Sequence, residues 1–175
     1  INRDAIVARV MEGIATPAGQ LLPAGFHGVS ENMKPLKYDP ELSKKLLAEA
    51  GYADGFKMTI HGPNDRYIND AKVAEALAQM FNRIGIEASV ETMTKAVYFK
   101  RASRGGPNDS PEFSFMLLGW GAGSGEASSP LKALLHTFDK SKGLGAANRG
   151  RHSDPRVDEI IQKALATVDL SLIHI

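Results

Sequence analysis

Cysteine is absent from the 175 residues, which excludes disulfides and thiolate metal sites. The five histidines are scattered and form no i, i+4 pair, so no metal site is expected. No run of 18 apolar residues occurs, so no transmembrane helix is predicted. The formal net charge is only +1, which favours neither nucleic acid nor a membrane surface as a general partner.

Sequence patterns of catalysis are also missing. No glycine-rich phosphate loop ends in Lys-Ser or Lys-Thr, and the glycine-rich residues 121–125 do not have the dinucleotide-binding spacing. Ser124 and Ser128 have neither a nucleophile elbow nor a nearby histidine. These absences predict a protein that binds a ligand, without a cofactor, rather than an enzyme.

The most informative stretch is the apolar run over residues 113–120, FSFMLLGW, in which Ser114 is the only polar side chain. A run that is apolar on both alternating faces predicts a strand covered on both sides, as in a parallel sheet packed between helices. The residues that follow, GAGSGEASS, cannot continue a strand and predict a flexible loop. Because ligands of open α/β sheets bind beyond the carboxyl ends of strands, residues 120–126 form the first candidate site.

Two further strands are predicted over residues 56–60 and 86–93, each followed by a helix. This order predicts a pair of βαβ units and a parallel sheet with right-handed crossovers. The strand over residues 86–93 is polar on one face and is therefore placed at an edge. The predicted class is α/β, with strand order 2-1-3 and helices on both sides. In this order, the turn-rich loop over residues 61–66 is expected to meet residues 120–126 at the switch point of the sheet.

Helix starts are marked by Asn2, Asp39 and Asp154, and by either Asn69 or Asp70, since a short polar side chain accepts the free amide hydrogens of a first turn. Asp39 and Asp154 each precede a proline, which needs no hydrogen-bond donor at the first helical position.

The predicted helices have apolar stripes at helical spacing, and these stripes are expected to face the core. The first helix is expected to end at residues 16–19, and a short helix is expected over residues 130–138. The stripe of the second helix comprises Leu42, Leu46, Leu47 and Ala50. The stripe of the last helix comprises Val157, Ile160, Ile161, Ala164 and Leu165.

Trp120 and Glu126 are the leading candidate ligand contacts. Trp120 offers a flat apolar side chain with one N–H donor, and flanking glycines such as Gly121 let a ligand approach. The alternative is a core tryptophan at a strand end. Glu126 is the only acid of its loop, and either accepts hydrogen bonds from a ligand or caps the helix that follows.

Two other loops contain polar candidates. Arg66 pairs either with an anionic ligand or with a nearby aspartate, and Asn64 is either a ligand contact or a turn residue. Asn148 and Arg149 belong to a basic, glycine-rich loop over residues 139–151. This loop either clamps an acidic group or is simply solvated, and the second interpretation is favoured.

Several blocks of sequence resemble one family, the extracytoplasmic solute-binding proteins of peptide-type ABC transporters, which bind dipeptides, oligopeptides, nickel or glutathione. The most specific block is YDPELSKKLLAEAGY over residues 38–52. Residues 1–18, INRDAIVARVMEGIATPA, the helix that ends in RIGI at residue 86, the Gly-Trp-Gly turn at Trp120 and NRGRHSDPRVD over residues 148–158 fit the same family. The resemblance runs from residue 1 to about residue 169.

The resemblance implies a periplasmic binding protein with two lobes that close on a small solute or short peptide, has no catalytic activity and delivers the ligand to a membrane permease. The chain then corresponds to most of the second lobe, and half a cleft is expected to bind its ligand weakly or not at all. The family's aromatic residue after the apolar strand lines the ligand cavity, and here it is Trp120. Peptide binders commonly have an aspartate three residues later that anchors the ligand's ammonium group. Gly123 occupies that position, so Glu126 is a candidate replacement.

The expected organisation is one ligand-binding lobe over residues 1–170, followed by residues 171–175, SLIHI, which break the polar helix face that precedes them. These last residues are interpreted as a cloning scar or a truncated frame, and the alternative is a native end. No direct membrane insertion of this piece is expected. Two alternatives to a transport protein remain. One is a small α/β enzyme that uses Glu126 and Arg66 on a polar metabolite, and the other is a scaffold or signalling module.

Overall fold

A computed structural model describes residues 1–167. The predicted cloning scar lies outside the described residues. The chain divides into two compact units. Unit 1 comprises Ile1–Pro17, Leu36–Arg104 and Glu112–Gly119, and unit 2 comprises Ala18–Pro35, Gly105–Pro111 and the chain from Trp120 onward. The assignment of residues 1–170 to one ligand-binding lobe stays a prediction.

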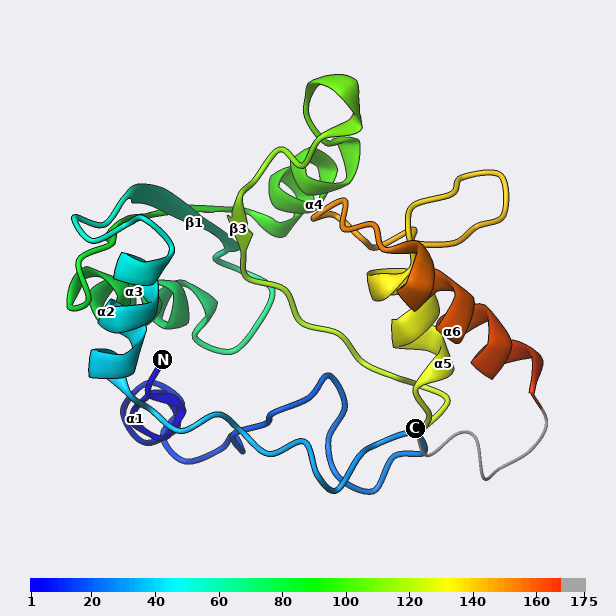
Figure 1. The fold of residues 1–175 in the computed structure, drawn as a ribbon, viewed down its shortest axis with the longest axis horizontal. Helices are drawn as coiled ribbons and strands as arrows, with labels where there is room; N and C mark the ends of the chain where they lie inside the picture. Colours follow the sequence, from blue (N-terminus) through cyan, green and yellow to red (C-terminus); the bar gives the residue numbers. More distant parts are fainter. Residues whose placement is uncertain (168–175) are drawn as a thin grey trace. The chain divides into compact units, whose positions relative to one another are not determined.

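Unit 1 contains a parallel three-stranded sheet (Figure 1). Its strands are β1 (Lys57–Pro63), β2 (Glu87–Met93) and β3 (Phe115–Met116), and their order is β2-β1-β3. β1 pairs with β2 from Lys57 opposite Glu87 to Pro63 opposite Met93. The predicted order 2-1-3, with the half-polar strand at the edge, is therefore confirmed.

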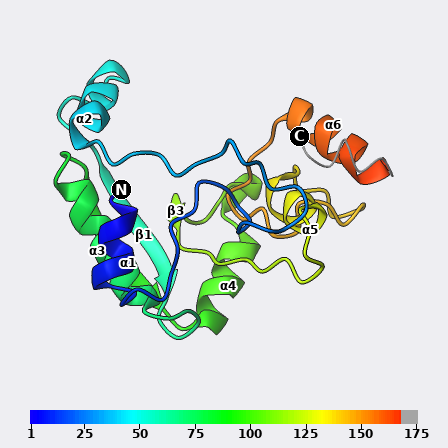
Figure 2. The same cartoon turned by 90° about the horizontal axis from the view of Figure 1, so that it is seen from below.

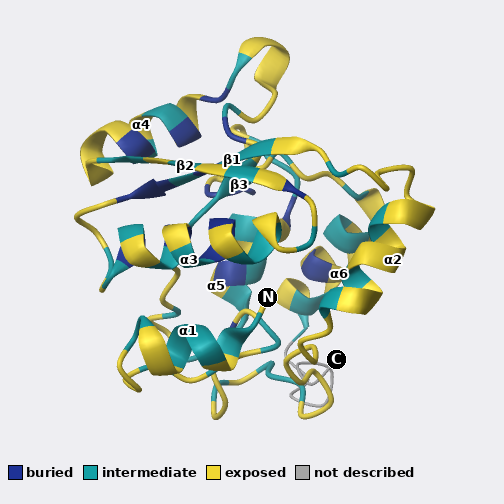
Figure 3. Cartoon of the chain, turned by 90° about the vertical axis from the view of Figure 1, so that its left-hand side faces the viewer, coloured by how far each residue is buried: buried dark blue, intermediate teal, exposed yellow. Residues whose placement is uncertain are grey.

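The two crossover helices cover opposite faces of the sheet, as expected (Figure 3). Helix α3 (Asp70–Asn82) packs Ala74 and Leu77 against Ile60 of β1, which is fully buried. On the other face, α4 (Lys95–Arg104) forms a second core in which Tyr98, Ala102 and Phe113 are almost completely buried. These two cores hold the carboxyl ends of the strands in place.

Helix α1 (Arg3–Arg9) lies beside α3, as Figure 2 shows. The side chain of Asn2 accepts a hydrogen bond from the Ala5 amide (2.9 Å), so the predicted cap is confirmed. The Asn69 side chain donates to the Val10 carbonyl oxygen (2.8 Å) and joins the two helices. The expected extension of α1 to residues 16–19 is wrong, because the backbone turns into positive φ at Glu12 and Gly13.

Two predicted strand boundaries are wrong. Residues 61–63 were expected in a loop, yet they continue β1, because β2 offers a partner to every residue as far as Pro63. The strand expected over residues 113–120 shrinks to Phe115–Met116. Phe113 leaves the sheet to enter the core under α4, and Leu118 and Trp120 are exposed.

Helix α2 (Pro40–Glu49) begins as predicted, since Asp39 accepts a hydrogen bond from the Leu42 amide (2.8 Å). Its apolar stripe is not buried, which corrects the expectation for that helix. The helix contains no buried residue (Figure 3), and Leu42 and Leu46 are 49% and 53% exposed. Helical periodicity identifies an apolar face but does not show that anything packs on it.

The difference in burial between α3 and α2 predicts that two leucine truncations in unit 1 will lower the free energy of unfolding by unequal amounts. We expect Leu77→Ala to lower the free energy of unfolding by about 2–5 kcal/mol, because Leu77 is buried against β1. Leu46→Ala is expected to change it by about 0.5 kcal/mol or less, because an exposed side chain leaves no cavity. Urea denaturation followed by circular dichroism measures both. Equal losses would show that α2 is packed in solution.

Unit 2 contains a short 3₁₀ turn, η1 (Pro107–Asp109), and a helical segment made of α5 (Ser128–Pro130) and the π-helical turn η2 (Leu131–Leu135). The helix expected over residues 130–138 therefore starts two residues early and ends three residues early. Helix α6 (Pro155–Ala166) is capped by Asp154, which accepts from the Arg156 amide (2.9 Å), as predicted.

Candidate ligand-binding site

The predicted site residues fall in both units. Asn64 and Arg66 belong to unit 1, whereas residues 120–126 and the pair Asn148 and Arg149 belong to unit 2. The expected meeting of the first two loops at the switch point stays a prediction.

Trp120 is 41% exposed, so it is not a core tryptophan. The loop after it is open: a Cβ atom built at Gly121 or at Gly123 meets no other atom within 4 Å. An accessible indole beside uncovered backbone is suited to stacking on a ligand and to hydrogen bonding through exposed peptide groups.

The chain reaches this loop through a tightly fixed residue of unit 1. The Tyr67 hydroxyl donates to the Gly119 carbonyl oxygen (3.3 Å), and a Cβ at position 119 would lie 2.7 Å from the Tyr67 ring. Only glycine fits there without displacing the ring. The contact with Tyr67 therefore fixes the position of the backbone at Gly119, the last residue before the loop.

The carboxylate of Glu126 is engaged inside its own loop. It accepts hydrogen bonds from the hydroxyls of Ser124 (2.6 Å) and Ser128 (2.7 Å) and from the Ser128 amide (2.7 Å). These hydrogen bonds, the one from Ser124 first, lower the pKa of the Glu126 carboxyl below its ordinary value. The contacts match the capping interpretation, and the ligand-binding role of Glu126 stays a prediction.

In unit 1, the loop after β1 presents Asn64 and Arg66 as exposed side chains. Its two aspartates are occupied by backbone groups: Asp65 accepts from the Lys95 amide at the start of α4 (2.6 Å), and buried Asp70 accepts from the amides of Arg66 and Tyr67 (3.0 Å each). The aspartates thus shape the loop and leave the Asn64 and Arg66 side chains directed outward.

The Asn148 side chain is buried and forms hydrogen bonds with backbone groups of neighbouring loop residues. Its Nδ2 donates to the carbonyl oxygens of His136 (3.1 Å) and His152 (2.7 Å), and its Oδ1 accepts from the His152 amide (3.1 Å). These bonds close the loop over residues 148–152. Arg149, next to it, is half-buried. The predicted clamp by Asn148 and Arg149 stays a prediction.

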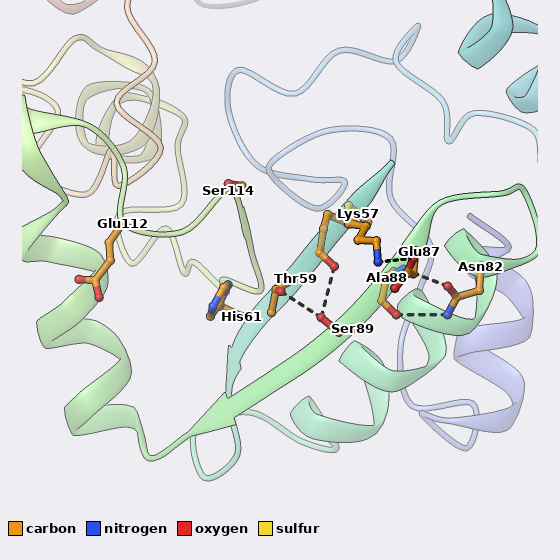
Figure 4. A pocket seen from close by; sticks show the side chains of 10 residues that line it. Lys57, Thr59, His61, Asn82, Glu87, Ala88, Ser89, Glu112 and Ser114 are labelled. Carbon is orange, nitrogen blue, oxygen red and sulfur yellow. Dashed lines mark hydrogen bonds and ion pairs between the residues drawn. The ribbon is translucent and has the colours of Figure 1, made fainter. Parts of the chain in front are cut away.

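A polar groove of about 690 Å³ in unit 1 was not predicted (Figure 4). It lies over cross-strand pairs of β1 and β2. Lys57 is 3.1 Å from Glu87, the hydroxyls of Thr59 and Ser89 are 2.9 Å apart, and His61 is 3.4 Å from Glu91. The alternation of polar residues in β1 was the signal that sequence reasoning missed. Because Lys57, Glu87, Thr59 and Ser89 already pair across the strands, we interpret the groove as a solvated face of the sheet, whereas the buried Nδ1 atom of His61 has no hydrogen-bond partner.

Beside the groove, Arg101 of α4 joins two carboxylates. It contacts Glu112 (2.7 Å) and Glu91 (2.9 Å), and its guanidinium lies 4.7 Å from the centre of the Phe113 ring. Its hydrogen bonds lower the pKa of both glutamates below the ordinary value. This cluster fixes α4 to the segment before β3.

Unit 2 also contains an apolar pocket of about 420 Å³ between α6 and the segment around Leu131, with Glu126 at its border. The predicted burial of the whole α6 stripe is wrong, since only Ile161 is buried and Ile160 and Leu165 are 58% and 41% exposed.

Within residues 1–167, no group of three or more His, Cys, Asp or Glu side chains is placed to hold a metal. No helix in that part combines the length and apolarity needed to cross a membrane.

Residues 1–142 match the sequence model of the bacterial extracellular solute-binding proteins, family 5, middle part. The chain belongs to this family. The sequence-based resemblance is thereby confirmed, and the family is one of binding proteins.

Two relatives of this family-5 chain are named for different ligands. The glutathione-binding protein GsiB of Escherichia coli K12 is 31% identical over 169 residues, covering 97% of this chain and 32% of the relative. The heme-binding protein A of Haemophilus influenzae is 29% identical over 171 residues, covering 94% of this chain and 29% of the relative. The chain thus spans about a third of the length of these relatives.

A solved structure shares the fold. It is the ABC transporter-associated periplasmic binding protein DppA from Helicobacter pylori in complex with the peptide STSA, which is 25% identical with a TM-score of 0.84. The match covers 99% of this chain and 33% of that one. The predicted class, an α/β periplasmic binding protein-like lobe with helices flanking a parallel sheet, is confirmed.

Proposed function

We propose that this family-5 chain is the ligand-binding part of a protein that captures a peptide or peptide-like small solute and delivers it to the membrane permease of an ABC importer. The observation that carries the proposal is the exposed indole of Trp120 beside the uncovered glycine loop. The similarity to a periplasmic binding protein in complex with a peptide supports both the ligand class and a periplasmic location.

Trp120, Gly121 and Gly123 are the proposed ligand contacts of unit 2, with stacking from the indole and hydrogen bonds from the open backbone. Asn64 and Arg66 are the proposed contacts of unit 1, because their side chains are exposed on a loop that Asp65 and Asp70 hold in shape. Asn148 and Arg149 are proposed to support the loop of unit 2 in which they lie.

We also propose that binding is not coupled to catalysis. Glu126, the acid that an enzyme would need in the glycine loop, already accepts three hydrogen bonds from Ser124 and Ser128. This arrangement stabilises the charged carboxylate and is unsuited to a group that must exchange a proton near neutral pH. The relatives GsiB and heme-binding protein A are also named as binding proteins.

Nuclear magnetic resonance of the whole chain tests the proposal, because Trp120 is the only tryptophan and gives a single indole N–H signal. Glutathione and the tetrapeptide Ser-Thr-Ser-Ala are titrated into the protein at millimolar concentration, since one lobe is expected to bind weakly. We expect saturable shifts of the Trp120 indole and of the Gly121 and Gly123 amides. Shifts confined to the β1–β2 groove, or none with these probes and a panel of dipeptides, would contradict the proposed site.

A further inference from the structure

The carboxylate of Glu126 binds three groups that all belong to its own loop. Oε1 accepts from the hydroxyls of Ser124 (2.6 Å) and Ser128 (2.7 Å), while Oε2 accepts from the Ser128 amide (2.7 Å). Hydrogen bonds to a charged acceptor are stronger than those between neutral groups. One side chain therefore ties the last part of the glycine loop to the start of α5.

The same end of the loop is anchored through its backbone. The Gly125 amide donates to the Ala122 carbonyl oxygen (3.0 Å), which closes a turn, and Gly125 has a positive φ of 74°. The His27 amide donates to the Gly125 carbonyl oxygen (3.1 Å), and His27 forms an isolated parallel bridge with Glu126. At the other end the chain is fixed at Gly119 and the side chain of Trp120 is exposed, so Glu126 is the side-chain anchor at the carboxyl end of the loop.

We propose that Glu126 is a positioning residue, which holds the loop over residues 120–126 in its open conformation without contacting the ligand. The proposal rests on the proposed function in that this loop presents the ligand contacts Trp120, Gly121 and Gly123. It also defines a switch: protonation of the carboxyl removes the charged acceptor and releases the loop.

The direction of this switch follows from the pKa of Glu126, which the hydrogen bonds of Ser124 and then Ser128 lower below the ordinary 4.5. Stabilisation of the loop by the carboxylate is therefore complete above pH 4.5 and is lost as the pH falls through the lowered pKa. The charge of His27, on the segment that bridges Glu126, acts in the same direction. Glu126 also borders the apolar pocket of unit 2. The α6 side chains that line this pocket carry no charge: Val157, Ile160, Ile161, Ala164 and Leu165.

Fluorescence anisotropy of Trp120, measured from pH 7 to pH 3, tests the switch without any ligand. In the unsubstituted chain we expect a fall in anisotropy with a midpoint below pH 4.5, under conditions where far-ultraviolet circular dichroism is unchanged. In Glu126→Gln, the amide oxygen can accept from the Ser128 amide while its two N–H groups donate to the two serine hydroxyls. This variant should keep the anisotropy of the unsubstituted chain at pH 7 and lose the acid transition.

Glu126→Ala removes all three hydrogen bonds. We expect low Trp120 anisotropy at every pH and exchange of the Ser128 amide hydrogen that is faster by about tenfold or more, as the loss of a hydrogen bond to a charged group implies. Ser124→Ala removes one bond and should lie between the two. The matched control is Asp139→Ala in the same unit, since Asp139 accepts from the Ser141 hydroxyl (2.6 Å) in a turn of its own. It should leave Trp120 and Ser128 unaffected.

An acid transition that persists in Glu126→Gln would overturn the proposal, because another group would then be responsible. So would unchanged anisotropy and unchanged Ser128 exchange in Glu126→Ala, or in Ser124→Ala if the first variant does not fold. None of these outcomes bears on whether residues 120–126 bind a solute, which the titration with glutathione and the tetrapeptide decides separately.

Discussion

Replacing Tyr98 by alanine is expected to lower the free energy of unfolding by about 3–5 kcal/mol, the usual cost of removing a buried aromatic side chain. Tyr98 is fully buried and stacks on Phe113 with ring centres 5.7 Å apart. Its hydroxyl donates to the Leu117 carbonyl oxygen (2.9 Å) just after β3. The substitution therefore leaves a cavity under α4 and an unpaired acceptor beside it. Urea denaturation followed by circular dichroism measures the loss.

Tyr98→Phe separates the two contributions, because it keeps the ring and removes the hydrogen bonding of the hydroxyl, which lies 2.9 Å from the Leu117 carbonyl oxygen and 3.4 Å from the His61 carbonyl oxygen. We expect this variant to lose about 1–2 kcal/mol, consistent with the loss of a buried hydroxyl's hydrogen bonding. If Tyr98→Ala lost no more than Tyr98→Phe, the ring would not be packed as described. The core between α4 and the sheet would then need a different explanation.

Removing the indole of Trp120 is expected to abolish saturable ligand binding by the chain. An aromatic residue at the centre of a binding surface typically contributes about 2 kcal/mol or more, and 2 kcal/mol corresponds to about a 30-fold change in Kd. Since a single lobe is expected to bind weakly, a 30-fold loss leaves no saturation at millimolar peptide. The measurement is the shift of the Gly121 and Gly123 amide signals in Trp120→Ala during titration with the tetrapeptide Ser-Thr-Ser-Ala.

Two variants serve as controls for Trp120→Ala. Trp120→Phe keeps an aromatic face but removes the N–H donor, so we expect it to retain part of the affinity. Ile160→Ala removes another exposed apolar side chain of unit 2 and should bind as the unsubstituted chain does. Equal binding by Trp120→Ala and Ile160→Ala would remove Trp120 from the site.

The sheet was predictable because its signals are local and agree with one another. The polar face of β2 places that strand at an edge, and the two crossover helices then have to cover opposite faces. The caps at Asn2, Asp39 and Asp154 were predictable for the same reason, since each bond is made within three residues of its acceptor.

The lengths of the strands and the burial of the helices were not predictable, because they depend on distant partners. Phe113 belongs to an apolar run that suggests a strand, but it lies outside the sheet because its ring packs on Tyr98 in the core under α4. The stripe of α2 has the right period, yet no residue of that helix is buried. A period shows which side chains share a face, and only a structure shows what that face meets.

The candidate site was proposed from the sequence and stays a prediction. The exposure of Trp120 agrees with a ligand contact, which the glycines on either side suggested. The partners of Glu126 come from serines two positions away on either side, and the sequence allowed both capping and ligand binding. Hydroxyl orientation decides between such possibilities, and residue types alone do not encode it.

The exposed stripe of α2 affects where the chain is expected to begin unfolding. A ten-residue helix is too short to persist by itself in water, and packing normally supplies most of its stability. Here the Asp39 cap and the surface pairs Glu41–Lys44 and Lys45–Glu49 have to do so, and such pairs contribute little. Fraying of α2 is therefore expected to cost the rest of the chain little, and we expect residues 40–49 to be among the first to unfold.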